Sequence, residues 1–482
     1  LATAPPADAP ALTVTSTVAH LGEREVLTSV LLFHPSIEAA IERRRAAEGE
    51  LLSARGAFDP RLDARGQTVP SGYYDSDFVD VALTQPTTLW GIEAIGGYRY
   101  GVPDPNSLPS FAPYNEDLET LDGGELRVGL KIPLLQGGPI DKRRASLRKS
   151  RIAVERFDAE VRAERLNLAR QSVTAYWTWR AAVAKLRVDQ RLTAIARARD
   201  VAVGRRVDEG TLAPIERVEA TRALRQREQA VVMSEQKVRL AAVKLSLFLR
   251  NADGEPAVPD LLAARPLSSR VLDVGAERLG AGLERALADR PEIEAITQKL
   301  AELDVQADLA QNQIFPKLDL KGNLSQDFGT APAGPSRTDD LDEMVLKIGV
   351  SLQLPVLLRE SRGQLRAARA RQDELKQKFR FTRDKLVAEV ERAWILLQTA
   401  TESAQLAVEL RELAETVAEG ERRRFEEGAA DLFTVFLRES LEGEAAAKAI
   451  EAIATQRAAD AIFELTTCLP SEAHGELGLP AC

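Results

Sequence analysis

Several segments of this chain alternate strictly between apolar and polar residues. Two of them cover 125–134 and 344–354, and a shorter one covers 317–324. A period of two predicts β-strands with one apolar face, formed in the first segment by Leu126, Val128, Leu130, Ile132 and Leu134. Strands of about ten residues are long enough to cross a bilayer when they are tilted. The same pattern also fits a half-buried strand of a soluble sheet.

A very long helical pattern follows the strands. Residues 139–209 are rich in Ala, Arg, Glu and Leu, and only Gly204 interrupts them. A helix of about 70 residues would measure roughly 105 Å. Gly210 and Gly428 are placed to end two such helices, and return helices are predicted over 215–250 and 432–467. Apolar residues at three-four spacing predict coiled-coil seams: Val154, Phe157 and Val161, and Leu406, Leu410, Leu413 and Val417.

The chain is a tandem duplication. Pro35-Ser36-Ile37-Glu38-Ala39 recurs 256 residues later as Pro291-Glu292-Ile293-Glu294-Ala295, and Pro60-Arg61-Leu62-Asp63 recurs at the same distance as Pro316-Lys317-Leu318-Asp319. Leu130-Lys131-Ile132-Pro133-Leu134 recurs only 222 residues later, as Leu352-Gln353-Leu354-Pro355-Val356. The first copy therefore holds about 34 extra residues between these segments. Within that surplus, 79–83 and 92–100 predict an additional hairpin.

Both copies have the order helix, strands, helical hairpin. The predicted organisation is an N-terminal extension (1–34), a first repeat (35–250, with strands within 58–134 and a helical hairpin over 139–250), a linker with short structure (251–290), a second repeat (291–468, with strands within 315–356 and a helical hairpin over 360–467) and a C-terminal tail (469–482).

Composition excludes several classes of protein. The 482 residues carry 64 Lys and Arg against 73 Asp and Glu, a net charge of −9, and this balance does not suit a nucleic-acid binder. No stretch of about 18 apolar residues predicts a transmembrane helix. Three histidines and two cysteines, Cys468 and Cys482, match no metal, cofactor or catalytic motif, so we expect no cofactor and no enzyme; the cysteines either pair or are idle thiols. The start, which is not Met, suggests an exported mature chain.

The ordered set of motifs resembles the TolC-like outer-membrane efflux proteins. The resemblance rests on the duplicated order of elements, on Pro133-Leu134-Leu135-Gln136-Gly137-Gly138 after a strand, and on the glycines at the hairpin ends. It implies an α+β membrane protein with a tandem-repeat fold, in which a trimeric transmembrane β-barrel continues into a long periplasmic α-helical coiled-coil barrel. The family's barrel has four strands per subunit, twelve in all. The additional hairpin belongs either to a larger barrel or to the periplasmic side.

The resemblance also implies function and partners. It predicts a homotrimer in outer-membrane lipid that passively conducts substrates from a periplasmic adaptor and an inner-membrane transporter to the exterior. A type I protein-secretion duct is the alternative within the family, and a soluble coiled-coil scaffold is the alternative from another class. The exported substrate is not encoded in any motif.

Two groups of residues match functional positions of the family. The hairpin tips, where relatives dock the adaptor, correspond to Glu209, Gly210 and Thr211 in the first copy and to Glu427, Gly428 and Ala429 in the second. A glycine there also suits any helical turn. Three arginines precede the second tip, Arg422, Arg423 and Arg424, and we interpret them as solvated or helix-end charges.

The pore constriction is the second group. Relatives carry carboxylates six and nine residues after the second tip glycine, where this chain has Thr434 and Leu437, with Phe433 and Phe436 close by. Acidic alternatives are Asp431 and, in the first copy, Glu216 and Glu219. The sequence therefore leaves open an acidic ring, a hydrophobic constriction that closes by dewetting, and a purely structural role of the two phenylalanines in a coiled-coil core.

Overall fold

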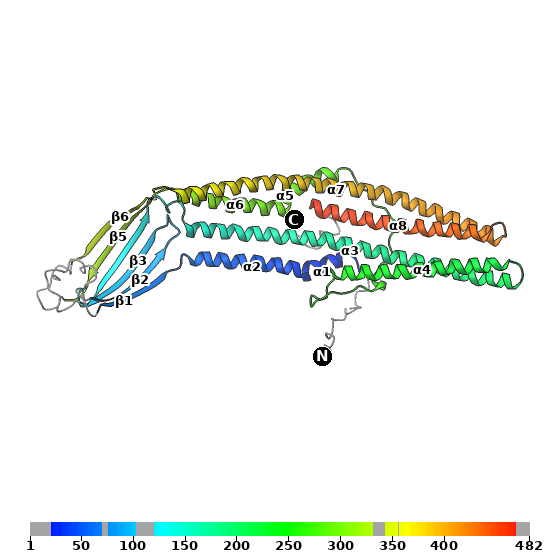
Figure 1. The fold of residues 1–482 in the computed structure, drawn as a ribbon, viewed down its shortest axis with the longest axis horizontal. Helices are drawn as coiled ribbons and strands as arrows, with labels where there is room; N and C mark the ends of the chain where they lie inside the picture. The colour runs from blue at the N-terminus through cyan, green and yellow to red at the C-terminus, as the bar shows by residue number, and fades with distance from the viewer. Residues whose placement is uncertain (1–20, 70–75, 103–119, 331–342, 355, 469–482) are drawn as a thin grey trace, which may run out of the picture. The chain divides into compact units, whose positions relative to one another are not determined.

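The computed structural model describes residues 21–69, 76–102, 120–330, 343–354 and 356–468 (Figure 1). Helix α1 (Glu23–Phe33) precedes the first repeat, which contains α2 (Pro35–Gly56), β1 (Arg61–Val69), β2 (Ser76–Pro86), β3 (Glu93–Val102), β4 (Glu125–Pro133), α3 (Lys142–Asp208) and α4 (Pro214–Ser246). The short helix η1 (Leu261–Ala263) and α5 (Arg278–Asp289) follow. The second repeat contains α6 (Pro291–Asn312), β5 (Lys317–Asp327), β6 (Val345–Gln353), α7 (Arg359–Glu426) and α8 (Leu432–Thr467). The duplicated order that the sequence predicts is present.

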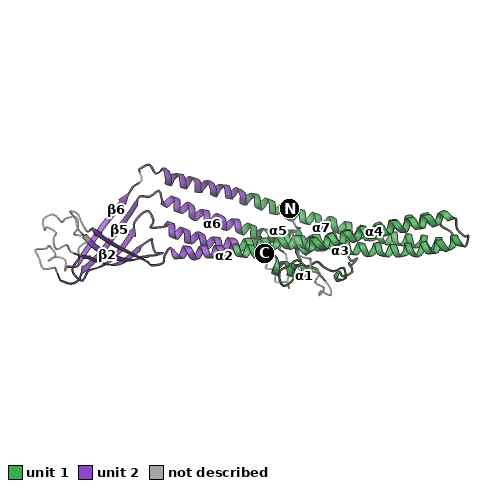
Figure 2. Ribbon diagram, turned by 60° about the horizontal axis from the view of Figure 1, so that its bottom comes forward, with its two compact units in different colours: residues 1–42, 158–294, 380–482 green, residues 43–157, 295–379 purple. Residues whose placement is uncertain are grey.

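The chain divides into two compact units, and neither unit coincides with one repeat (Figure 2). One unit comprises Leu1–Glu42, Asp158–Glu294 and Arg380–Cys482, and the other comprises Arg43–Phe157 and Ala295–Phe379. Each unit takes segments from both copies of the duplication. The second unit holds the sheet, and the first holds the ends of the helical hairpins.

Within the described residues, the sheet contains six strands in the order β1-β2-β3-β4-β5-β6, and every neighbouring pair is antiparallel. The additional hairpin lies inside this sheet as β2 and β3. Ten residue pairs join β2 to β3, with Val81 opposite Tyr98 and Val79 opposite Tyr100. β4 and β5 then join the two repeats, with Val128 opposite Leu324.

The register gives the sheet one apolar and one charged face, because cross-strand partners share a face. Most of the apolar face is exposed. Its apolar members are Leu62, Val79, Val81, Leu83, Tyr98, Tyr100, Leu126, Val128, Leu130, Ile132, Leu318, Leu320, Leu324, Leu346, Ile348, Val350 and Leu352. The charged residues of the opposite face are Arg61, Asp63, Arg65, Asp80, Glu93, Arg99, Glu125, Arg127, Lys131, Lys317, Asp319, Lys321, Asp327 and Lys347.

Two aromatic clusters lie at equivalent places of the duplication in the helical unit. Tyr176 and Trp179 of α3 are buried with residues of α1 and α4, and Trp394 of α7 is buried against Phe463 of α8 and against α5. Tyr176 and Trp394 occupy equivalent positions, as the offset of the repeats predicts. Because α1 and α5 supply part of this packing, they belong to the helical core.

The structure adds detail to parts of the helical unit that the sequence left unspecified. Residues 23–33, assigned to an extension, form α1, and the linker contains a helix of 12 residues, α5. The predicted seam of α7 is not buried within the chain: Leu406, Leu410, Leu413 and Val417 are all exposed. Small residues on another face of α7 pack instead, among them Ala404 and Ala418, because they let neighbouring helices approach closely.

Two further expectations concern membranes and cysteines. Within the described ranges, none of the helices combines the length and the apolar character that membrane crossing requires. Cys468 is disulfide-bonded. Cys482 and the tail to which it belongs lie outside the described residues, as do residues 1–20 of the predicted extension.

Candidate functional site

The first hairpin tip is a tight helix C-terminus built around Gly210. Its φ of +72° is accessible to glycine at little cost. The N–H of Gly210 donates to the carbonyl of Val207 at 2.9 Å, and the N–H of Thr211 donates to that of Arg206 at 2.8 Å. These two bonds form a Schellman motif, which satisfies carbonyls at the end of α3. Pro214 then begins α4 at its first position.

The second tip repeats this geometry. Gly428 has a φ of +77°, its N–H donates to the carbonyl of Phe425 at 3.1 Å, and the N–H of Ala429 donates to that of Arg424 at 2.7 Å. Glu209, Thr211, Glu427 and Ala429 are exposed beside the two glycines. The structure therefore presents the predicted tip residues as two similar exposed turns.

The carboxyl group of Asp431 caps α8. Its Oδ1 accepts a hydrogen bond from the backbone N–H of Thr434 at 2.7 Å. The hydrogen bonds from Thr434 lower the pKa of Asp431, so it is ionised at neutral pH. Of the two residues predicted at the constriction, Thr434 is half-buried, whereas Leu437 is 47% exposed.

The two phenylalanines have different surroundings. Phe436 packs against a small core between the hairpins, around Val203, Ala220 and Leu432. Phe433 is 67% exposed. Phe433 and Leu437 are four residues apart on α8 and therefore share a face of the helix. Within the chain, Phe436 therefore contributes to a core and Phe433 does not.

The first hairpin also exposes apolar residues after its tip. Ile215 and Val218 are exposed, while Glu216 and Glu219 are half-buried. Glu219 accepts a hydrogen bond from the side chain of Arg222 at 3.0 Å. Ile215 and Val218 occupy the positions equivalent to Phe433 and Phe436. The two acids therefore lie beside an exposed apolar pair.

A buried ion cluster joins the two hairpins near these residues. Arg199 of α3 makes two hydrogen bonds to Glu439 of α8, at 2.5 and 2.6 Å. Arg422 of α7 bonds both Glu439, at 3.0 Å, and Glu442, and Arg191 of α3 bonds Glu442 at 3.2 Å. Only 5% of Glu439 and 3% of Glu442 are exposed. Such charge-assisted, two-pronged contacts fix the geometry of the helices that they join.

The two glutamates of this cluster differ in pKa. Burial raises the pKa of Glu439, but the bonds and charges of Arg199 and Arg422 outweigh burial and bring the pKa below its ordinary value. Burial raises the pKa of Glu442 above its ordinary value, and the adjacent Glu439 carboxylate adds to this effect. The prediction that Arg422 is a solvated or helix-end charge is wrong, because its guanidinium is held between two buried carboxylates.

On the sheet, the charged face carries its own ionic network. Asp80 of β2 is only 3% exposed and contacts three arginines from three strands: Arg65 of β1 at 3.5 Å, Arg99 of β3 at 3.8 Å and Arg127 of β4. Lys131 of β4 bridges Glu93 of β3 at 3.4 Å and Asp319 of β5 at 3.9 Å. These pairs connect five of the six strands across one face.

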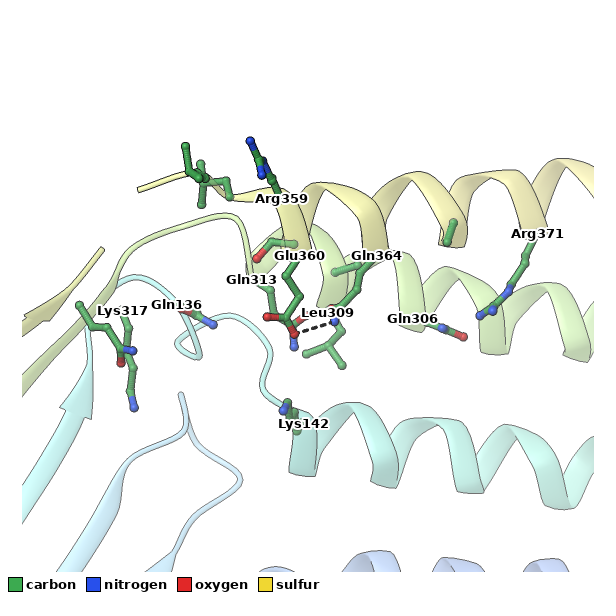
Figure 3. A pocket seen from close by; sticks show the side chains of 16 residues that line it. Gln136, Lys142, Gln306, Leu309, Gln313, Lys317, Arg359, Glu360, Gln364 and Arg371 are labelled. Atoms are coloured by element: carbon green, nitrogen blue, oxygen red, sulfur yellow. Dashed lines mark hydrogen bonds between the residues drawn. The ribbon is translucent and has the colours of Figure 1, made fainter. Parts of the chain in front are cut away.

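A cavity of about 660 Å³ lies where α6 and α7 approach the sheet within the same unit (Figure 3). Lys142, Arg359 and Arg371 line it together with several glutamines, and Gln364 donates to Glu360 at 3.2 Å. Among the described residues, no buried polar side-chain atom without a partner lies in this cavity. The lining mixes charged and amide side chains with apolar ones such as Leu309 and Leu358.

Comparison with protein families shows which family this chain belongs to. The family model of the outer membrane efflux protein matches residues 111–249 and 282–462, which is more than half of the chain. The chain belongs to the outer membrane efflux protein family. This outer membrane efflux protein is therefore a channel of the outer membrane and not an enzyme, and its family assembles as trimers within tripartite pumps.

Solved structures share the fold of this outer membrane efflux protein. It is similar to the Neisseria gonorrhoeae MtrE outer membrane channel in its open state, with 16% identity, a TM-score of 0.65, and 96% of this chain and 97% of that chain covered. It is also similar to the Vibrio cholerae outer membrane protein VceC (16% identity, TM-score 0.63, 92% and 95% covered) and to the Campylobacter jejuni CmeC outer membrane channel (15%, 0.62, 92% and 85%). No curated protein matches the chain by sequence.

Proposed function

We propose that this chain is the exit duct of a tripartite export system, with the sheet as its outer-membrane part and the two hairpin tips as its docking points for a periplasmic adaptor. The observation that carries the proposal is the two-faced sheet, in a chain of a family of outer-membrane channels. A continuous exposed apolar face suits lipid, and a charged face suits a water-filled lumen. Substrates would pass along the charged face without covalent chemistry.

The tips are suited to docking a partner. Both turns are exposed, both have the same Schellman geometry, and each offers short side chains directly beside a glycine, Thr211 and Ala429. Two equivalent turns per chain, six in a trimer, would present a ring of similar sites. The hydrogen-bonded cores behind the turns keep their shape fixed before docking, which lowers the entropic cost of binding.

For the constriction, we favour the hydrophobic alternative. Asp431 is engaged as a helix cap and Glu219 is paired with Arg222, whereas Phe433 and Leu437 form an exposed apolar row. Copies of this row from three chains would form apolar rings, and a narrow apolar ring closes a pore by excluding water. The pump and adaptor determine the cargo, so a type I protein-secretion duct remains the alternative use of the same channel.

Photo-cross-linking tests the docking proposal in intact cell envelopes. A photoreactive amino acid at Thr211 or at Ala429 is expected to attach the chain covalently to the periplasmic adaptor of the same cell. The exposed Arg239, on α4 away from the tip, is the matched control position and is expected to give no such product. Equal labelling at Arg239, or no labelling at either tip in envelopes that contain the trimer and the adaptor, would contradict the docking proposal.

A further inference from the structure

We infer that the outer-membrane barrel of this protein is built from eighteen strands, six from each of three chains, with β1 of one chain paired to β6 of the next. This inference rests on the proposed function, since only a membrane-embedded trimer must close the edges of its sheet. The occupant of each open edge is then a second copy of this chain.

The edges of the sheet require such a partner. Within the described residues, β1 and β6 each pair with only one strand, so each has one side that no described strand covers. A lipid-exposed sheet with open edges is not viable, because unpaired N–H and C=O groups have no water to bond. Six strands are also fewer than the eight found in the smallest membrane barrels. Closure therefore falls to neighbouring copies.

The strand count per chain allows this closure. Because all five internal pairings are antiparallel and six is an even number, β6 runs opposite to β1. A β6–β1 contact between copies is therefore antiparallel as well. It also continues the apolar face, since Leu346, Ile348 and Val350 of β6 would meet Leu62 and Ala64 of β1 on the lipid side.

The hairpin of β2 and β3 is an integral part of the barrel wall. Its apolar residues continue the lipid face, and its charged residues continue the opposite face. Asp80 of β2 is held by Arg65, Arg99 and Arg127, which lie on β1, β3 and β4. If the hairpin left the sheet, Asp80 would lose its contacts with Arg65 of β1 and Arg127 of β4, which hold β2 and β3 between these two strands.

The turn between β2 and β3 is also anchored. Trp90 donates through Nε1 to the carbonyl of Pro133, at the end of β4, at 2.9 Å. Gly91 has a φ of +72°, and a Cβ there would lie 2.7 Å from the carbonyl oxygen of Gly137. A Cβ on Gly138 would lie 2.7 Å from Trp90 Nε1. Because only glycine allows these approaches, the turn is fitted to the segment that follows β4.

The consequence is a wider exit through the outer membrane. In the described part of the chain the second repeat supplies two strands, so a chain without the additional hairpin would supply four, and a trimer twelve. Barrel diameter grows roughly linearly with strand number, so eighteen strands give an exit about 1.5 times as wide and about 2.3 times as large in area. Barrels of 16–18 strands hold an open aqueous channel. The outer-membrane segment then passes larger cargo than a twelve-stranded exit.

Cross-linking between chains tests closure. Leu62→Cys is combined in turn with a cysteine at Leu346, Ile348, Val350 or Leu352, and the membranes are treated with a lipid-soluble oxidant. At least one combination is expected to give covalent dimers and trimers on a denaturing gel. If none does, although both cysteines are labelled in the folded protein, the trimeric channel itself is contradicted, and the strand count with it.

Cross-linking within the chain tests the strand count alone. Leu62 of β1 lies opposite Leu83 of β2, so Leu62→Cys with Leu83→Cys is expected to form a disulfide. In a twelve-stranded barrel β1 would instead pair with β4. Because Leu318 lies opposite Leu352 in the second repeat, the equivalent pair there would be Leu62 and Leu130. A disulfide of Leu62→Cys with Leu130→Cys, but not with Leu83→Cys, found by mass spectrometry, would overturn the inference.

The unaltered protein provides a second readout, because substitutions on the lipid face can block insertion. Electron cryomicroscopy of the detergent-extracted trimer is expected to show eighteen strands, with β2 and β3 between β1 and β4. A trimer with twelve strands in the wall and this hairpin outside it would overturn the inference and leave the exit-duct function standing.

Discussion

Arg199 of α3 and Glu439 of α8 form two parallel hydrogen bonds, at 2.5 and 2.6 Å, and so tie the first helical hairpin to the second. Both side chains are largely buried, at 12% and 6% exposure. The pair holds α8 from the side of the helix opposite to the exposed Leu437, because the buried Glu439 follows Leu437 by two residues. It therefore fixes the position of α8 where we place the constriction.

Substituting Arg199 should destabilise the protein. Arg199→Ala leaves Glu439 buried with Arg422 as its remaining cationic partner, and breaking a buried pair costs about 3–5 kcal/mol. We expect a clear loss of thermal stability of the purified protein in detergent. Arg222→Ala is the matched control, because its pair with Glu219 is exposed and such pairs contribute about 0–1 kcal/mol. Equal losses for the two variants would show that the Arg199 pair contributes no special stability.

The carboxylate of Glu439 should make the stability of the protein depend on pH. The pKa of Glu439 lies below its ordinary value of 4.5, so its stabilising contribution is present above that value and is lost as pH falls through the lower pKa of the folded state. Glu439→Gln should be less stable than wild type at pH 7, and the difference should shrink as the solution is acidified through that pKa. Melting temperatures measured across the acid range test this.

The control for this pH dependence is Glu374→Gln. Glu374 pairs with Lys378 on an exposed surface, where solvent screens the interaction. The melting temperature of the Glu374→Gln variant should equal that of the wild type at every pH. A Glu439→Gln variant that also follows the wild type throughout would contradict the role assigned to the buried pair.

The tip glycine should be sensitive to a single methyl group. Gly428 has a φ of +77° with open space around its Cβ position, so Gly428→Ala meets no clash but costs about 1–2 kcal/mol in backbone strain. Gly420, within α7, has equally open space and no positive φ, and Gly420→Ala should stabilise by about 0.5–1 kcal/mol. Opposite shifts in unfolding free energy are expected. Shifts of the same sign would contradict the Schellman geometry.

The constriction proposal predicts a change in leak current. Phe433→Asp or Leu437→Asp places charge in a row that we expect to exclude water, so single channels in planar bilayers should conduct more than wild type. Phe433→Leu keeps the apolar character and should leave the conductance low. Unchanged conductance in both aspartate variants, with trimers intact, would contradict a hydrophobic constriction.

The duplication and the alternation of apolar and polar residues predicted most of the fold. The offset between the Pro35 and Pro291 segments identifies the repeats, and strict alternation identifies β4, β5 and β6, because both signals are local in the sequence. The glycines at 210 and 428 likewise indicate the tips, since a positive φ restricts the residue type.

Contacts between distant helices were beyond sequence reasoning. Arg199 and Glu439 lie 240 residues apart, and neither belongs to a motif. Arg422 was assigned to the surface because it stands beside Arg423 and Arg424. Those two are exposed, but the helix turns Arg422 toward Glu439 and Glu442. The exposure of Leu410 was missed because three-four spacing indicates a seam without indicating which chain supplies the partner.

The mass and location of the particle test the central claim most directly. The chain, expressed with an export signal, should fractionate with the outer membrane. When extracted in detergent, it should form a particle of three 52.7 kDa chains, about 158 kDa of protein. A monomer or dimer that stays in solution without detergent would contradict the channel and would favour a coiled-coil scaffold.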